Sequence, residues 1–240
     1  MIKNIFLLND ANYHQKKQLF YAFFFTIFTV IALGIDSVSF LSSFFDGRQI
    51  TNVLAIAYFS LFFYVSDSTL KKLMLLMVLL SYIGEIIFCT LLGMYQYRTE
   101  MIPLYVPFGH AIVYASGYVF AHTNWAIKHE KRLCTIFITF FILLFIAVGY
   151  FLNDVFSLIF GALFFVILKR KKWQNLYCFI ALCVLFIELV GTYFNCWTWA
   201  SKTFSLIPTA NPPMGAIFFY AGGDVLLVKI ISYLNKIKKT

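Results

Sequence analysis

The chain has 240 residues, of which 62% are hydrophobic and 12% are charged, and its net charge is +9. Soluble domains carry about 25% charged residues, so this composition excludes an ordinary water-soluble globular protein. Apolar runs such as residues 136–148 do not alternate between apolar and polar positions. A membrane-spanning β-barrel requires that alternation, and the other way to satisfy backbone hydrogen bonds in lipid is the α-helix. The sequence therefore predicts an all-α membrane protein.

The N-terminal segment is polar and carries Lys3, Lys16 and Lys17 before the first apolar run. It lacks a short apolar region followed by a small-residue cleavage site, so we expect no cleavable signal peptide. The first apolar run is then a retained membrane helix. The five cysteines include no Cys-x-x-Cys pair, and most lie within apolar runs, which argues against a disulfide framework and against a zinc site.

The apolar runs predict a bundle of eight transmembrane helices, near residues 17–35, 50–66, 72–94, 104–122, 133–151, 154–169, 175–195 and 213–232. The second and sixth are short for a span of about 20 residues. No linker or low-complexity segment interrupts the chain, which predicts a single transmembrane domain over residues 1–240.

Basic residues are distributed unequally between the two sides that eight spans define. With the N-terminus inside, 16 of the 19 Lys and Arg residues fall on the inner side, and only Arg48, Arg98 and Lys202 fall outside. Cytoplasmic loops of membrane proteins carry such an excess. We therefore expect a protein of the bacterial inner membrane, with both termini in the cytoplasm. The basic residues are divided among short loops, which favours contact with anionic lipid over a nucleic-acid partner.

Two regions of the chain resemble each other. Each has a membrane glutamate, an aromatic-x-aromatic triplet, an Ile-Pro pair and a Pro-x-Gly segment: first Glu85, Tyr95 to Tyr97, Ile102-Pro103 and Pro107 to Gly109, then Glu188, Trp197 to Trp199, Ile207-Pro208 and Pro213 to Gly215. A glycine, a tyrosine and a second glycine follow each proline at offsets of 2, 7 and 10. These are Gly109, Tyr114 and Gly117 in the first copy, and Gly215, Tyr220 and Gly223 in the second.

The two copies lie four predicted helices apart and share one orientation. This predicts a parallel 4+4 internal repeat about an axis along the membrane normal, with halves at approximately residues 17–122 and 133–232.

Ionisable residues inside the predicted spans are the candidates for chemistry, because a charged group at the bilayer centre costs at least about 2.5 kcal/mol. We interpret four of them as catalytic and expect them to face one another: Glu85, Glu188, His110 and Asp224. The alternative interpretation is structural. The glutamates could be protonated hydrogen-bonding groups, and His110 could cap a helix.

A second set of polar and aromatic residues lies in the adjacent loops and helices. We interpret them as substrate-binding: Tyr97, Arg98, Tyr114, Trp197, Trp199, Asn211 and Tyr220. The aromatic pairs could instead form an interfacial aromatic belt. Arg98 could instead form a solvated ion pair with Glu100.

The segment from Glu85 through Gly93-Met94-Tyr95-Gln96-Tyr97 to Pro103-Leu104-Tyr105-Val106-Pro107 resembles carotenoid-biosynthesis membrane proteins. It is similar to the carotenoid hydratase-like family and, more loosely, to the small membrane lycopene cyclases, over about 35 residues. The cyclases have an acidic motif after the proline, whereas this chain has Pro107-Phe108-Gly109-His110. The resemblance implies an isoprenoid substrate.

These features favour an intramembrane enzyme that uses paired carboxylates for acid–base chemistry on an apolar isoprenoid or other lipid. The reaction would be a hydration, cyclisation or isomerisation, in which a buried glutamate is the proton donor. We expect no cofactor and no metal. The expected partners are membrane lipid and an apolar small molecule, and the oligomeric state stays open. The alternatives are a proton- or ion-coupled transporter, and a metal-dependent oxidoreductase or hydrolase.

Overall fold

The computed structural model describes residues 12–99, 101–171 and 173–237. Glu100, Lys172, Lys238 and Lys239 and the segment 1–11 lie outside the described residues. The described chain folds into a helical bundle, which confirms the predicted all-α class. Its α-helices are α1 (Asn12–Ile35), α2 (Val38–Ser43), α3 (Arg48–Val65), α4 (Ser68–Glu85), α5 (Tyr105–Ala121), α6 (Asn124–Lys128), α7 (Glu130–Phe151), α8 (Val155–Lys169), α9 (Gln174–Tyr193) and α10 (Ile217–Ile237).

Among the described residues, five helical segments are long and apolar enough to cross a membrane: Lys16–Ile35, Ser68–Leu91, Glu130–Phe151, Gln174–Tyr193 and Met214–Tyr233. The helix α8 is apolar but shorter. By length and composition, the chain is a multi-pass integral membrane protein.

The helix α5 lies at the centre of the bundle, where it packs against α1, α3, α4 and α9. Most of its residues are buried, and small ones allow close approach of the neighbouring helices. A Cβ atom added at Gly117 would lie 2.7 Å from the Cα atom of Ile180 on α9, so a glycine is required at this crossing. The hairpin of α7 and α8 packs beside α9 and α10: α7 contacts α9, and α8 contacts both α9 and α10.

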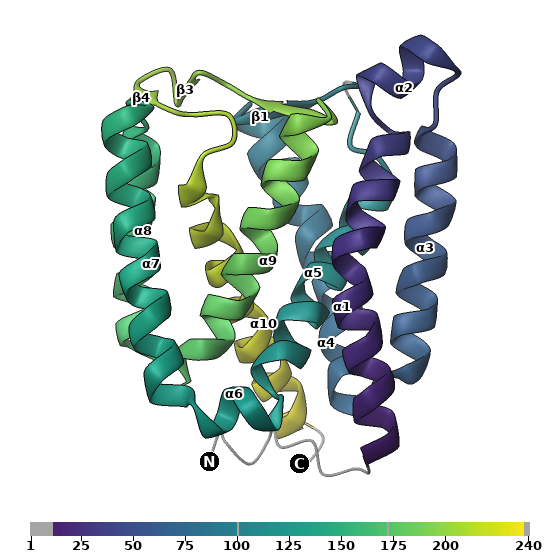
Figure 1. The fold of residues 1–240 in the computed structure, drawn as a ribbon, viewed down its shortest axis with the longest axis vertical. Helices are drawn as coiled ribbons and strands as arrows, with labels where there is room; N and C mark the ends of the chain where they lie inside the picture. Colours follow the sequence, from purple (N-terminus) through teal and green to yellow (C-terminus); the bar gives the residue numbers. More distant parts are fainter. Residues whose placement is uncertain (1–11, 100, 172, 238–240) are drawn as a thin grey trace.

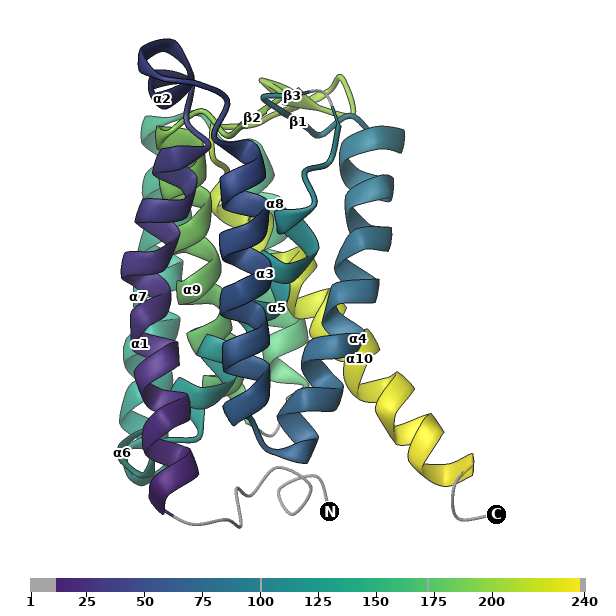
Figure 2. The same cartoon turned by 90° about the vertical axis from the view of Figure 1, so that its right-hand side faces the viewer.

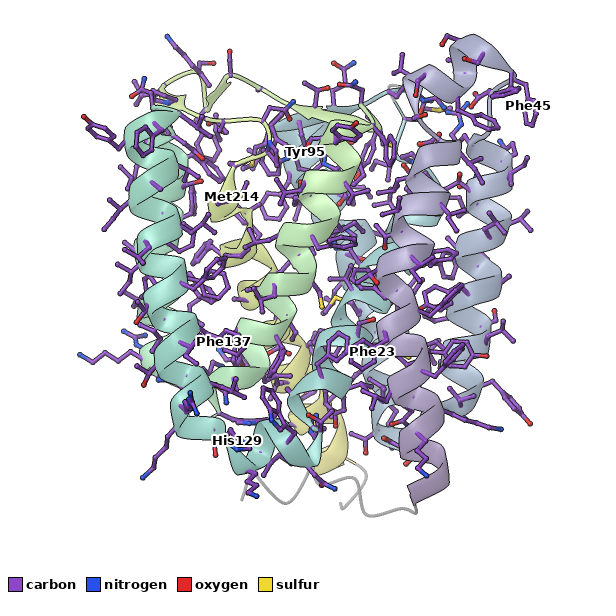
Figure 3. All side chains as sticks on the ribbon, viewed as in Figure 1. Phe23, Phe45, Tyr95, His129, Phe137 and Met214 are labelled. Carbon is purple, nitrogen blue, oxygen red and sulfur yellow. The ribbon has the colours of Figure 1, made fainter. Side chains whose placement is uncertain are left out.

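Short strands gather at one end of the bundle, which we call the strand end. They are β1 (Tyr95–Tyr97), β2 (Trp197–Trp199), β3 (Lys202–Thr203) and β4 (Ile207–Pro208). The first described turn of α1 and the last turn of α10 both lie at the opposite end, on different sides of the bundle (Figures 1 and 2). Figure 3 shows Tyr95 at the strand end and His129 at the opposite end.

The strands β1 and β2 pair antiparallel, although about 100 residues separate them in the chain. Tyr95 lies opposite Trp199, and Tyr97 lies opposite Trp197. Backbone hydrogen bonds from Arg98 N to Cys196 O and from Ala200 N to Met94 O, each 2.9 Å long, extend the pairing. The two aromatic-x-aromatic triplets, which the sequence suggested only as separate copies of a repeated segment, therefore form one two-stranded sheet.

The predicted helix limits are wrong by a few residues at several ends. The helix predicted over 72–94 begins at Ser68, and after Glu85 it continues as a π-helix, η1 (Ile86–Leu91). The helix predicted from residue 213 begins with a 3₁₀ turn, η2 (Met214–Ala216), before α10. The short helices α2 and α6 were not predicted, because each is too short to produce a clear hydrophobic period.

The pairing of β1 with β2 is open to a direct test. Gln96 and Thr198 are exposed and directly opposite each other, so cysteines at these positions lie within the range of Cα distances that disulfides accept. We expect Gln96→Cys/Thr198→Cys to form a disulfide on mild oxidation, measured by peptide mass mapping in a background without the native cysteines. The matched pair Gln96→Cys/Ser201→Cys should stay reduced. Equal oxidation of both pairs would contradict the register.

Candidate active site

Glu85 is buried at the last turn of α4 and accepts hydrogen bonds on both carboxylate oxygens. The hydroxyls of Tyr95 and Tyr97 donate to Oε2 at 2.9 and 2.8 Å. The Nε2 atom of His110, on α5, lies 2.9 Å from Oε1. A buried carboxyl group is tolerated only when it is hydrogen-bonded, and these three groups are its hydrogen-bond partners.

The local backbone places the two tyrosines over Glu85. The π-helix η1 begins at the residue after Glu85, and π-helical turns in α-helices occur frequently at functional sites. The chain then reverses at Gly93, whose φ of +58° is a left-handed conformation that glycine adopts without steric cost. This turn directs β1 back across the end of α4, so that both phenols reach the carboxylate.

Glu188, on α9, is held by the second aromatic triplet. The indole Nε1 groups of Trp197 and Trp199 donate to the same oxygen, Oε2, at 3.0 and 3.1 Å. The Trp197 ring lies against Gly191, where an added Cβ atom would come within 1.9 Å of the ring, so only glycine fits there. Beneath these two rings, Glu188 lines a cavity.

We call each glutamate with its two ring donors a clamp: Glu85 with Tyr95 and Tyr97, and Glu188 with Trp197 and Trp199. The strand pairing brings both clamps to one cavity. The rings of Tyr95 and Trp199 lie 4.7 Å apart, and those of Tyr97 and Trp197 lie 6.1 Å apart. A largely apolar cavity of about 380 Å³ lies beneath them. Seven of the eleven candidate residues line it: Glu85, Tyr97, His110, Glu188, Trp197, Trp199 and Tyr220.

Tyr220 connects the two clamps across the cavity. Its ring stacks on that of His110, with centroids 4.9 Å apart and planes at 10°. Tyr220 lines the same cavity as Glu85 and Glu188. Acidic, imidazole and phenolic groups from α4, α5, α9 and α10 therefore meet in one apolar space, which can transfer protons to and from an apolar molecule.

Asp224 lies apart from this cavity, in contrast to the expectation that it faces Glu85, His110 and Glu188. It is fully buried on α10, and neither of its carboxylate oxygens has a hydrogen-bond partner of normal geometry among the described residues. Tyr114 and Tyr177 are its polar neighbours. Tyr114 is also absent from the cavity lining, because its ring points from α5 toward Asp224.

Arg98 is a structural residue of the strand end and does not line the cavity. Its guanidinium lies 2.7 Å from both Asp36 and Asp46, and its side chain is only 9% exposed. Tyr105 donates a hydrogen bond of 2.8 Å to the second oxygen of Asp36. Glu100, the expected partner in a solvated ion pair, lies outside the described part of the chain. Arg98 itself is largely buried and is paired with Asp36 and Asp46.

Asn211 supports the site from outside the cavity. Its side-chain oxygen accepts a 3.0 Å hydrogen bond from the backbone N–H of Trp199, which fixes the end of β2. The sequence-based set omitted Tyr95, which contacts Glu85 directly, and Asp36, which holds Arg98. Tyr95 was detectable, because it begins the same triplet as Tyr97. Asp36 gave no such signal, because it lies at the predicted end of an apolar run.

Within the described residues, no group of three or more His, Cys, Asp or Glu side chains is arranged to hold a metal ion. The fold and the site together define a helical membrane protein with two aromatic-clamped glutamates in one cavity. Comparisons with protein-family models, curated proteins and solved structures find no match for this chain.

The Arg98 cluster makes a stability prediction. Asp36 is 1% exposed, so removing its cation leaves a buried carboxylate without charge compensation. We expect Arg98→Met to lower the free energy of unfolding by about 3 kcal/mol. Arg98→Met/Asp36→Asn should recover part of that loss, measured by thermal or denaturant unfolding in detergent. A double variant as unstable as Arg98→Met would contradict this account.

The same cluster also predicts how the free energy of unfolding depends on pH. The hydrogen bond from Arg98 holds the pKa of Asp46, in the exposed loop before α3, below its ordinary value. A carboxyl whose folded pKa is lowered stabilises the fold above its ordinary pKa, and that contribution is lost as the pH falls through the folded value. Asp46→Asn should therefore destabilise the protein at neutral pH and have no effect in strong acid.

Proposed function

We propose that this protein is an intramembrane enzyme that transfers protons to and from an apolar isoprenoid or other lipid. The single observation that carries the proposal is the hydrogen-bonded pair of Glu85 and His110 facing Glu188 in one apolar cavity. Structural glutamates would need hydrogen-bond partners, but they would not need a cavity in front of them. The isoprenoid class rests on the resemblance of the Glu85 segment to carotenoid-biosynthesis proteins.

The proposed chemistry begins with a proton donated by the His110 and Glu85 pair to an alkene carbon. A C–H bond forms, the π bond breaks, and a carbocation remains on the neighbouring carbon. The faces of aromatic rings such as those of Trp197 and Trp199 stabilise a cation in a water-poor site. In a hydration, water adds to the cation and Glu188 accepts the proton that the water loses. In an isomerisation or cyclisation, Glu188 removes a carbon-bound proton, and return of that proton to His110 completes either cycle.

A second candidate function is proton- or ion-coupled transport, which Asp224 favours. A fully buried carboxyl without hydrogen-bond partners of normal geometry among the described residues is suited to binding and releasing a proton. Its position apart from the cavity offers a second protonation site in series with Glu85 and Glu188. An enzyme needs Glu85 and Glu188 but not Asp224, whereas a coupled carrier needs all three.

Glutamine variants test the acid–base proposal, because glutamine keeps the shape of glutamate but cannot donate or accept the proton. We expect Glu85→Gln and Glu188→Gln each to slow the reaction by about 100-fold or more. The measurement is mass spectrometry of isoprenoid extracts incubated in D₂O with protein in nanodiscs, which detects incorporated deuterium or an added water.

The matched control is Glu130→Gln, which lies at the start of α7, away from the strand end and the cavity. It should retain the activity of the unaltered protein. Unchanged unfolding temperatures would show that the Gln variants fold. If both cavity variants retained full activity, the glutamates would be structural and the acid–base proposal would be wrong.

We further propose the membrane arrangement: eight spans in a parallel 4+4 repeat, in a bacterial inner membrane, with both termini in the cytoplasm. Three features support the repeat. The two clamps pair about a local two-fold axis between Gln96 and Thr198. The helix α5 contacts α4 and α9, and α10 contacts the same two helices. The Pro-x-Gly offsets of the two copies are identical.

Lys202, which is exposed on β3, tests the orientation. Because the basic residues concentrate at the end opposite to the strands, we expect Lys202→Cys to react with a membrane-impermeant maleimide added outside the cell. A cysteine at Lys128, in α6 at the other end, should react only after the membrane is opened. The reverse labelling pattern would invert the proposed topology.

A further inference from the structure

The cavity reaches the surface of the bundle along the seam between α4 and α10. Among its lining residues, only three are classed as exposed: Ile83 at 52%, Ile87 at 40% and Leu226 at 49%. Ile83 belongs to α4, Ile87 to the π-helical continuation of α4, and Leu226 to α10. All three are apolar, so this opening faces lipid.

The α10 side of this seam is lined by two adjacent glycines. Gly222 and Gly223 both line the cavity, and a Cβ atom added at either would find no atom within 4 Å. Glycine destabilises a helix by about 1 kcal/mol relative to alanine. At Gly222 and Gly223 no close contact requires a glycine, whereas at Gly117 the close approach of α9 does.

Comparison of the two copies of the repeated segment sharpens this difference. Gly117 and Gly223 occupy the same offset from Pro107 and Pro213. At Gly117, α5 and α9 are in direct contact, and a Cβ atom would lie 2.7 Å from the Cα atom of Ile180. At Gly223 the corresponding space is open. Figure 2 shows α10 crossing α4 obliquely and its later part diverging from the bundle. One of two equivalent seams is therefore closed and the other is open.

We propose that the seam between α4 and α10 is a lateral entrance through which a single hydrocarbon chain passes from the bilayer to the two glutamates. Gly222 and Gly223 are the residues that set its width. The chain would lie along Leu226, Gly223 and Gly222, with its reacting end beneath Tyr95 and Trp199. This inference rests on the proposed function, in that the same cavity holds the substrate during the reaction.

Tryptophan fluorescence tests the entrance without requiring turnover. Trp197 and Trp199 line the cavity, and Trp125→Phe/Trp173→Phe removes the other two tryptophans. The probe is 1-bromohexadecane, a single chain whose bromine quenches fluorescence on contact, added to protein in nanodiscs of unbrominated phosphatidylcholine. We expect quenching in this background and loss of most of it in Gly222→Leu/Gly223→Leu. Ala162→Leu, exposed on α8, is the matched control and should be quenched like the background.

A second variant, at the mouth of the entrance, tests the proposal if the double glycine variant does not fold. Ile83→Phe/Ile87→Phe enlarges two exposed side chains at the mouth and should also reduce quenching by 1-bromohexadecane. Iodide, which stays in water, should quench Trp197 and Trp199 weakly in every folded variant. Equal quenching by the bromoalkane in background and narrowed variants, or strong quenching by iodide, would overturn the lateral entrance.

The failure of this inference is distinguishable from failure of the proposed function. Glu85→Gln in the same tryptophan background should keep full quenching, because it alters the proton donor and leaves the entrance unchanged. If Glu85→Gln retains activity while the glycine variants lose quenching, the acid–base proposal is wrong and the entrance stands. If Glu85→Gln loses activity while the glycine variants are quenched normally, the entrance alone is wrong.

Discussion

The antiparallel pairing of β1 with β2 is the interaction on which the site depends. Each strand places two ring donors on one glutamate, so the two glutamates share a cavity only because the strands lie side by side. The pairing also joins the two regions of the chain that contain the clamps. The helices α5 and α10 each contact both α4 and α9, and the strand pair adds a direct link between the ends of α4 and α9 that carry the glutamates.

Much of the helical architecture followed from the sequence, because lipid permits few backbone solutions and long apolar runs are unambiguous. The repeated pattern also singled out Glu85, Glu188 and the aromatic triplets near them, but it predicted substrate binding or an aromatic belt for the rings and not their hydrogen bonds to the glutamates. The pairing of β1 with β2 did not, because three-residue strands have no detectable periodicity and their partners are distant in the chain. The sequence also predicted that Asp224 faces the other three ionisable residues, but it could not give the rotation of α10, in which Tyr220 lines the cavity and Asp224 does not.

Arg98 illustrates a different limit of sequence reasoning. An arginine beside an aromatic pair at a membrane surface suggests a ligand contact, and its nearest acidic residue in sequence suggests a solvated pair. The structure instead gives it Asp36 and Asp46, both more than 50 residues away. Contacts of this kind depend on the folding of the segment between α1 and α3 over β1. Arg98 therefore joins the segment between α1 and α3 to the β1–β2 strand pair. It stabilises the strands that cover the cavity and does not itself line the cavity.

The two clamps differ in one chemical respect that their similar geometry conceals. Tyrosine hydroxyls both donate and accept hydrogen bonds, whereas an indole N–H only donates. The hydroxyl of Tyr95 or Tyr97 can therefore relay a proton to or from Glu85, whereas Trp197 and Trp199 offer Glu188 no such route. In the proposed 4+4 repeat, phenols in one half correspond to indoles in the other, and the indoles cannot relay a proton to their carboxylate. Under the proposed mechanism the two glutamates then differ in proton supply: Glu85 lies beside hydroxyls that can relay a proton, whereas Glu188 exchanges its proton only within the cavity.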